Sequence, residues 1–180
     1  MNLSDSPQII EKTKKIRCLI CDVDGVLTNG FLYIDINGNE SKAFHVLDGM
    51  GLKLLMSAGI EVAIITTTSN TIIDERMKQL GIKHFYKGQT NKQKAYETLK
   101  ATLNLPDEAF AYIGDDLPDL PIIQQVGLGV AVGSAVSQVK HAADLVTTKD
   151  GGFGGVRELC DFILTTQDKF NLALENYLTA

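Results

Sequence analysis

The chain has 180 residues, a length typical of one domain, and we expect a single domain over residues 1–180. Hydrophobic residues make up 44% of it and charged residues 22%, a composition that excludes a disordered or fibrous chain. Seventeen basic and twenty-two acidic residues give a net charge of −5, which argues against nucleic acid or an anionic membrane as a partner.

The sequence also indicates where in the cell the protein is located. No apolar run reaches the roughly 18 residues that a membrane-spanning helix needs, and the first fifteen residues lack the apolar centre of a secretory signal. Three cysteines are an odd number, and the strand-like run that holds Cys18 and Cys21 would place them on opposite faces. We therefore expect buried, reduced thiols and a cytoplasmic protein.

Apolar runs of strand length alternate with segments of helical periodicity along the chain. The expected strands are 16–21, 62–66, 83–86, 110–113, 128–132 and 144–147. The expected helices are 51–58, 71–80, 91–103, 117–126 and 156–166. This alternation predicts right-handed βαβ units and an α/β fold with a doubly wound, Rossmann-like parallel sheet.

The segment 31–46 departs from this alternation. Its two runs, 31–36 and 41–46, flank Asn37-Gly38-Asn39, and an Asn-Gly pair favours the tight turn of a β-hairpin. The hairpin follows the first strand directly, where α/β proteins form their binding crevice. We expect a projecting hairpin insertion over 31–46, and a flexible or peripheral segment over 1–15.

Two carboxylates follow the first strand, in Asp22-Val23-Asp24-Gly25. At positions i and i+2 of an extended chain both side chains point the same way, and Gly25 permits a sharp turn beyond them. Like charges held close in a crevice are costly unless a cation lies between them, and Mg²⁺ suits a site with few carboxylates and several waters. The alternative is a surface turn, because Asp and Gly are common in turns.

A second acidic group follows the strand 110–113, in Gly114-Asp115-Asp116-Leu117-Pro118-Asp119. The carboxyl ends of parallel strands meet at one edge of a sheet, so Asp115 is expected beside Asp22 and Asp24. Taken alone, these residues could instead begin a helix, where acidic side chains stabilise the helix dipole.

Two further polar side chains come from the strand ends between these groups. Thr66 ends the run 62–66, and Lys92 begins the helix after the strand 83–86. A hydroxyl and an ammonium that face one crevice could bind the oxygens of a phosphoryl group. For either residue alone, helix capping by Thr66 or a solvated first turn at Lys92 remains the alternative.

In chain order the strand ends carry a carboxylate pair, a hydroxyl, a lysine and a second carboxylate group. This order resembles the haloacid dehalogenase superfamily of phosphotransferases, over residues 16–167. The resemblance implies that Asp22 is the nucleophile and forms an aspartyl-phosphate. It implies that Asp24 first protonates the leaving oxygen and then activates water as a base.

The same resemblance implies roles for the remaining polar residues. Thr66 and Lys92 would bind the phosphoryl group together with Asp24. A Mg²⁺ ion would be held by Asp22, the backbone carbonyl of Asp24, and Asp115. Asp116 and Asp119 would support that metal site.

A closer resemblance is to a small branch of the superfamily that has no cap domain and hydrolyses 3-deoxy-D-manno-octulosonate 8-phosphate in lipopolysaccharide sugar synthesis. The segments that carry it are 22–30, 33–45, 48–49, 88–92, 114–119 and 151–158. The resemblance implies a homotetramer in which neighbouring subunits cover the site in place of a cap. We expect His45, at the base of the hairpin, to face the crevice and contact the substrate, with surface or hairpin packing as the alternative.

Four positions depart from the pattern of that branch. Thr67 and Thr68 stand where a Gly-Arg pair is usual, and Leu47 and Phe153 stand where arginines are common. Arginine binds carboxylate and phosphate groups bidentately, so these positions leave the choice of substrate open. The alternatives are an N-acylneuraminate 9-phosphate or another sugar-acid phosphate, a non-catalytic tetramerisation module, and a phospho-acceptor signalling domain.

Overall fold

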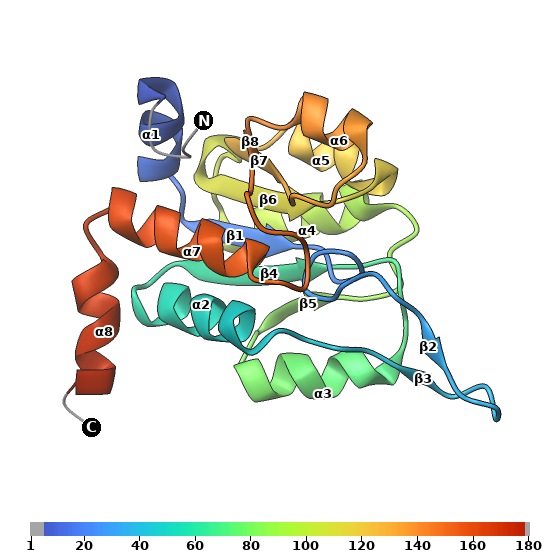
Figure 1. Ribbon diagram of the computed structural model, residues 1–180. Coiled ribbons are helices and arrows are strands. Elements are labelled where there is room, and N and C mark those ends of the chain that lie inside the picture. The colour runs from blue at the N-terminus through green and yellow to red at the C-terminus, as the bar shows by residue number, and fades with distance from the viewer. Residues whose placement is uncertain (1–5, 179–180) are drawn as a thin grey trace.

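The computed structural model describes residues 6–178, so the first five residues of the expected peripheral segment lie outside the described part. A six-stranded parallel sheet forms its centre, with strand order β5-β4-β1-β6-β7-β8 (Figure 1). Its strands are β1 (Cys18–Cys21), β4 (Glu61–Ile65), β5 (His84–Tyr86), β6 (Phe110–Gly114), β7 (Leu128–Ala131) and β8 (Leu145–Val146). The predicted Rossmann-like fold class is therefore confirmed.

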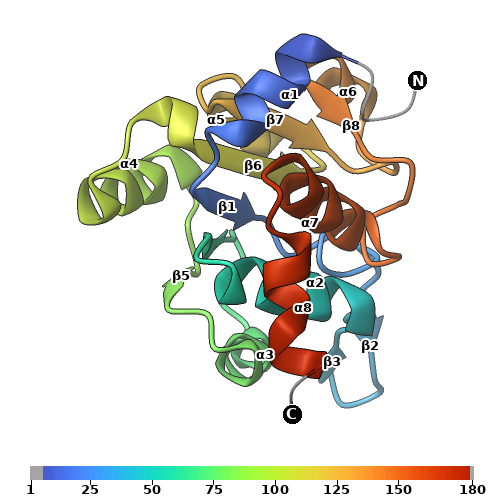
Figure 2. The ribbon, with the colours of Figure 1, turned by 90° about the vertical axis from the view of Figure 1, so that its left-hand side faces the viewer.

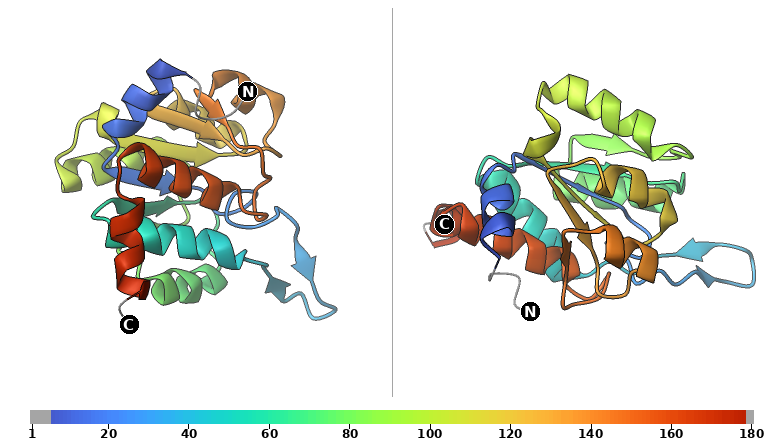
Figure 3. Two further views of the ribbon diagram at one scale, coloured as in Figure 1. Left: turned by 60° about the vertical axis from the view of Figure 1, so that its left-hand side comes forward. Right: turned by 90° about the horizontal axis from the view of Figure 1, so that it is seen from above.

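Helices cover both faces of this sheet, with α2 and α7 on one side and α4, α5 and α6 on the other (Figures 2 and 3). The helices are α1 (Pro7–Lys14), α2 (Val46–Ser57), α3 (Thr71–Leu80), α4 (Lys92–Leu103), α5 (Leu120–Ile123), α6 (Ser137–Ala142), α7 (Gly155–Thr166) and α8 (Phe170–Leu178). Short 3₁₀ turns cover Asp107–Ala109 and Leu117–Asp119. Because both faces are covered, the inner strands are apolar throughout, and every residue of β1 is buried.

The hairpin is the one part of the described chain that projects from this body (Figure 1). Its strands are shorter than the predicted 31–36 and 41–46, because only β2 (Tyr33–Ile34) and β3 (Glu40–Ser41) pair. An isolated bridge between Thr28 and Phe44 closes its base. No cap domain lies among residues 6–178, as expected.

Several helix predictions need correction. Helix α2 begins at Val46 rather than at residue 51, and the predicted helix 117–126 is a 3₁₀ turn followed by the four-residue α5. Residues 7–14, which carry no expected element, form α1 against α7, with Thr13 fully buried and Lys12 paired to Asp144. Helices α6 and α8 are also absent from the prediction. Within residues 6–178, none of the helices has the length and apolar character to cross a bilayer.

Candidate active site

The register of the sheet brings the polar residues together. Cys21, the last residue of β1, pairs with Ile64 of β4 on one side and Ile113 of β6 on the other. The chain therefore leaves these three neighbouring strands at nearly the same level, followed by Asp22, Thr66 and Asp115 respectively. Distant acidic positions meet because of strand order, as the sequence predicts.

A pocket of about 220 Å³ opens at this edge. It is lined by Asp22, Asp24, Gly25, Gly30, Thr67, Lys92, Asp115, Asp116, Pro118 and Asp119. Two predicted residues are absent from this lining. Thr66 is 1% exposed, and its hydroxyl accepts a hydrogen bond from the Thr68 backbone, while Thr67 lies at the pocket wall.

The loop after β1 is a turn, not the extended chain expected over residues 22–24. Both carboxylates still reach the pocket, because the turn begins only after Asp22. Gly25 has a φ of +81°, and a Cβ built on it would lie 2.0 Å from Asp115 Oδ2. A side chain at residue 25 would therefore displace Asp115, so glycine is required by both backbone angle and space.

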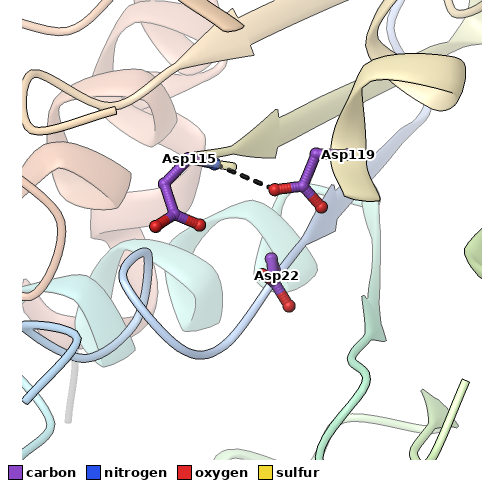
Figure 4. A group of neighbouring side chains, drawn as sticks. All are labelled: Asp22, Asp115 and Asp119. Atoms are coloured by element: carbon purple, nitrogen blue, oxygen red, sulfur yellow. Dashed lines mark hydrogen bonds between the residues drawn. The ribbon is translucent and has the colours of Figure 1, made fainter. Parts of the chain in front are cut away.

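Asp22, Asp115 and Asp119 form the acidic centre of the pocket (Figure 4). One carboxylate oxygen of each lies within 4.8 Å of the others. Burial, followed by the charge of Asp119, raises the pKa of Asp22 to about 7. Burial, followed by the charges of Asp22 and Asp119, likewise raises the pKa of Asp115 to about 7. Without a cation, these carboxyls retain protons that ordinary aspartates have lost at neutral pH.

Asp119 differs from the other two because both of its oxygens are already engaged. Its Oδ2 accepts hydrogen bonds from the backbone N–H groups of Asp115 and Asp116, at 2.9 and 3.2 Å. Its Oδ1 accepts one from the Tyr112 hydroxyl at 2.6 Å and one from Lys92 Nζ at 2.7 Å. A carboxylate has about four acceptor positions, so Asp119 holds the site in shape rather than offering a free metal ligand.

Lys92 joins the nucleophile candidate to this scaffold. It is 4% exposed, which removes the solvated first turn as an interpretation, and its Nζ lies 2.9 Å from Asp22 Oδ1. Burial alone lowers the pKa of Lys92, but the charges of Asp22 and Asp119 outweigh it and raise that pKa above its usual value. The ammonium is therefore charged and fixed between Asp22 and Asp119 at the pocket wall.

The residues fit a divalent cation. Asp22 Oδ1 is buried, and Lys92 Nζ lies 2.9 Å from it as an ion pair. The three carboxylates of Asp22, Asp115 and Asp119 leave excess negative charge beside the Lys92 ammonium, which is costly unless a further cation or protons neutralise it. Hard oxygen ligands of this kind suit Mg²⁺, with Asp22 and Asp115 as side-chain ligands.

Asp24 and His45 lie in different surroundings. Asp24 lines the pocket with 38% of its side chain exposed, and its Oδ1 accepts a hydrogen bond from Lys42 of the hairpin. His45 precedes α2, with its Nδ1 4.0 Å from Asp48 Oδ2, and does not line the pocket. The pocket lining thus includes most of the predicted site residues but neither Thr66 nor His45.

Comparison with known proteins identifies the family to which the chain belongs. A model of haloacid dehalogenase-like hydrolases matches residues 84–159. The 3-deoxy-D-manno-octulosonate 8-phosphate phosphatase of Yersinia pestis is 48% identical over 161 residues, covering 89% of this chain and 86% of that protein. The chain belongs to the haloacid dehalogenase-like hydrolase family. The predicted enzyme class, a phosphatase, is confirmed with it.

Solved structures of haloacid dehalogenase-like hydrolases agree with this assignment. A subfamily III A hydrolase from Legionella pneumophila has a TM-score of 0.94 and 65% identity, and the match covers 96% of this chain and 95% of that one. The 3-deoxy-D-manno-octulosonate 8-phosphate phosphatase of Moraxella catarrhalis has a TM-score of 0.89 and 41% identity, covering 93% and 97%. The latter structure is a complex with a magnesium ion, a phosphate ion and the sugar acid.

Two residues at the site were not singled out from the sequence. Lys42 contacts Asp24, and Tyr112 contacts Asp119 from inside the sheet. A lone lysine in a hairpin carries no sequence signal for such a contact. Tyr112 precedes the Gly114-Asp115 motif, but a tyrosine within an apolar strand is usually read as core.

Proposed function

We propose that this phosphatase releases inorganic phosphate from 3-deoxy-D-manno-octulosonate 8-phosphate in a Mg²⁺-dependent reaction. The observation that carries the proposal is the acidic centre, in which the buried Asp22 and the half-buried Asp115 lie together, with Lys92 Nζ 2.9 Å from Asp22 Oδ1. The substrate and the metal follow from relatives, because the Moraxella catarrhalis enzyme was solved with magnesium, phosphate and the sugar acid.

In the proposed reaction Asp22 attacks phosphorus and the sugar oxygen leaves. A bound Mg²⁺, held by Asp22, Asp115 and the backbone carbonyl of Asp24, would supply positive charge that lets the two anions approach. Lys92 binds a phosphoryl oxygen with its ammonium, and Thr66 is proposed to assist with its hydroxyl. Both contacts stabilise the charge that develops on phosphorus.

Asp24 completes both halves of the reaction by moving one proton. It first gives a proton to the leaving sugar oxygen, so the sugar departs as an alcohol and Asp22 carries the phosphoryl group. It then takes a proton from water, which attacks phosphorus and returns Asp22 as a free carboxylate. Its partial exposure at the pocket suits this exchange with solvent and substrate.

The direct test replaces the nucleophile without changing its shape. Asp22→Asn should leave the circular dichroism spectrum unchanged, and phosphate release from 3-deoxy-D-manno-octulosonate 8-phosphate should fall to background. Excess EDTA should stop the wild-type enzyme, and added Mg²⁺ should restore it. Substantial turnover by Asp22→Asn would contradict the mechanism. If the wild-type protein instead accumulates as a stable phosphoprotein without turnover, a phospho-acceptor signalling domain is favoured.

A nine-carbon substrate is the second candidate, because N-acylneuraminate 9-phosphate shares a carboxylate and a terminal phosphate with the eight-carbon one. Thr67 at the pocket wall, and Leu47 and Phe153, 48% and 58% exposed, offer no guanidinium to a carboxylate and so favour neither length. A panel of eight- and nine-carbon sugar-acid phosphates, compared by kcat/KM, tests the choice. A higher kcat/KM for N-acylneuraminate 9-phosphate would replace the substrate proposed above.

The proposed assembly is a homotetramer built around the hairpin, and the proposed location is the cytoplasm. The apolar side chains of the hairpin are exposed in the single chain: Phe31, Leu32, Tyr33, Ile34 and Ile36. A contiguous apolar surface of this kind usually meets a partner, and a projecting strand pair is a pairing hazard unless covered. The described cysteines are free and buried, as in a reducing compartment.

A further inference from the structure

Lys42 is an unusual residue for its place in the fold. It lies in the returning arm of the hairpin, directly after β3, where the neighbouring Ser41 and Ala43 are exposed. Its own side chain is only 3% exposed. Burying an ammonium is costly unless a carboxylate or several acceptors satisfy it, and its ion-pair partner is Asp24.

The returning arm is fixed on both sides of Lys42. On one side, Glu40 accepts a hydrogen bond from the Asn70 side chain at 2.8 Å, which ties the hairpin to the start of α3. On the other, Phe44 bridges to Thr28 and lies under the Arg76 guanidinium, 5.7 Å from its ring centroid. The position of the Lys42 ammonium is therefore set by the fold and not by a free side chain.

Lys42 reaches Asp24 from outside the pocket. The residues that line the pocket include Asp24 but not Lys42. The contact uses Asp24 Oδ1, and no hydrogen bond is made to Oδ2 by the described residues, although the carboxylate sits on a turn and is 38% exposed. An exposed side chain would otherwise sample several rotamers, and fixing one costs conformational entropy.

We propose that Lys42 is a positioning residue for the proton-transfer step: its buried ammonium holds Asp24 in the orientation from which it reaches the leaving oxygen. This inference rests on the proposed function, because it requires Asp24 to be the acid. It assigns the hairpin a catalytic contribution within one chain, separate from any contact with a second copy.

The test measures the first half of the reaction alone, phosphoryl transfer to Asp22, in rapid-quench single turnovers with two esters that differ in their need for an acid. The sugar leaves as a basic alkoxide unless it is protonated, whereas p-nitrophenolate leaves without a proton. Lys42→Met should lower the single-turnover rate of sugar release about tenfold or more, a part of the 10²–10⁴-fold that a general acid contributes. Its KM for the sugar phosphate, and its single-turnover rate of p-nitrophenolate release, should change by less than about threefold. Lys42→Arg keeps the charge and should recover most of the sugar-phosphate rate.

Two further variants separate positioning from a merely structural role. Ser41→Ala changes an exposed side chain of the same arm, keeps the ties at Glu40 and Phe44, and should leave the ratio of the two rates unchanged. Adding Lys42→Met to Asp24→Asn should cost no further activity on p-nitrophenyl phosphate or the sugar phosphate, because both changes remove one function. Circular dichroism and thermal unfolding establish that each variant is folded.

Equal losses in the two single-turnover rates, an equal change of their ratio in Ser41→Ala, or an added loss in the double variant would overturn the role of Lys42 and leave the proposed function standing. A folded, Mg²⁺-supplied wild type that hydrolyses neither ester would overturn the proposed function, and this inference with it. The two failures are therefore distinguishable.

Discussion

Asp22 and Asp115 owe their chemistry to burial next to other carboxylates. Because their pKa values are raised to about 7, both tend to be protonated below pH 7 when no cation is bound. A cation must displace those protons, so Mg²⁺ should bind more weakly as the pH falls from 8 to 6, with up to about tenfold loss per pH unit for each proton released. Isothermal titration calorimetry in buffers of different ionisation enthalpy measures both the affinity and the protons released.

The same carboxyl groups make the stability of the fold depend on pH in a direction that their raised pKa values determine. In the metal-free protein their raised pKa values add stability below about pH 4, and this contribution is lost as the pH rises through about 7. The increase in melting temperature caused by Mg²⁺ should therefore be larger at pH 8 than at pH 6. A pH-independent increase would show that the acidic centre is not where the cation binds, and Asp115→Asn is the matched control.

Tyr112 makes a second residue-level prediction. Its buried hydroxyl donates to Asp119 Oδ1 at 2.6 Å, so Tyr112→Phe removes a donor from a carboxylate that has no solvent to replace it. We expect the free energy of unfolding in urea to fall by about 1.5–3 kcal/mol, the usual contribution of a hydrogen bond to a charged group. Tyr33→Phe removes an exposed hydroxyl and should change it by less than about 0.5 kcal/mol. Equal effects would mean that the Tyr112 bond contributes nothing specific.

At the scale of single residues, the sequence predicts that Asp22 and Asp115 lie close together, but it does not predict that the Lys42 ammonium contacts Asp24. Asp22 and Asp115 follow apolar strand runs, and parallel topology alone brings such ends together. Lys42 reaches Asp24 only because the hairpin folds back over the loop, and no periodicity or spacing encodes that path. His45 differs from Lys42 in the opposite way. Its place at the base of the hairpin predicts contact with the crevice, but it is absent from the pocket lining.

Among the elements, α2 packs against α7 and is also joined to it by hydrogen bonds from one side chain. Asp48 of α2 is 1% exposed and accepts hydrogen bonds from the backbone N–H groups of Gly154 and Arg157, at 3.3 and 2.8 Å. It therefore caps the start of α7 from a neighbouring helix, at a point where the cap residue Gly154 offers no side chain. Asp48→Ala should lower the free energy of unfolding by about 1–2 kcal/mol, as for other lost caps.

The matched control for Asp48 lies on α7 itself. Asp161 pairs with Arg157 at 2.7 Å, four residues apart on a partly exposed helix face, where such pairs contribute about 0.3–0.5 kcal/mol. Urea unfolding of Asp161→Ala should therefore show a much smaller change than that of Asp48→Ala. If the two variants lose equal stability, the cap is not what joins α7 to α2.

The elements that the sequence predicts best have their own end signals. Helix α3 matches its predicted bounds 71–80, because the Asn70 side chain caps its start and Gly81, with a φ of +76°, ends it. The predicted helix 117–126 is shortened because Pro118 and Pro121 cannot donate backbone hydrogen bonds. Helices α1 and α8 depend on packing against α7, which local periodicity does not reveal.

For the whole molecule, the exposed hairpin determines how copies would meet. If the proposed homotetramer is built on it, the double variant Ile34→Lys and Ile36→Lys should dissociate the assembly, because each lysine would be buried without a partner. Val146→Lys, at a 38% exposed position on the edge strand β8, should leave the assembly intact. Sedimentation equilibrium measures the mass of each species, and a monomeric wild type at micromolar concentration would contradict the tetramer.

Strand β1 lies inside the sheet, bonded to β4 on one flank and β6 on the other, and it ends in Asp22. If the edge strands β5 or β8 fray, the hydrogen bonds that join β1 to β4 and to β6 remain intact. The amides of residues 18–21 should therefore exchange with deuterium only when the entire domain opens, at the slowest rate in the protein. The carboxylate proposed as nucleophile thus directly follows the segment least disturbed by local opening, and conditions that loosen the edge of the sheet should leave its position unchanged until the whole domain unfolds.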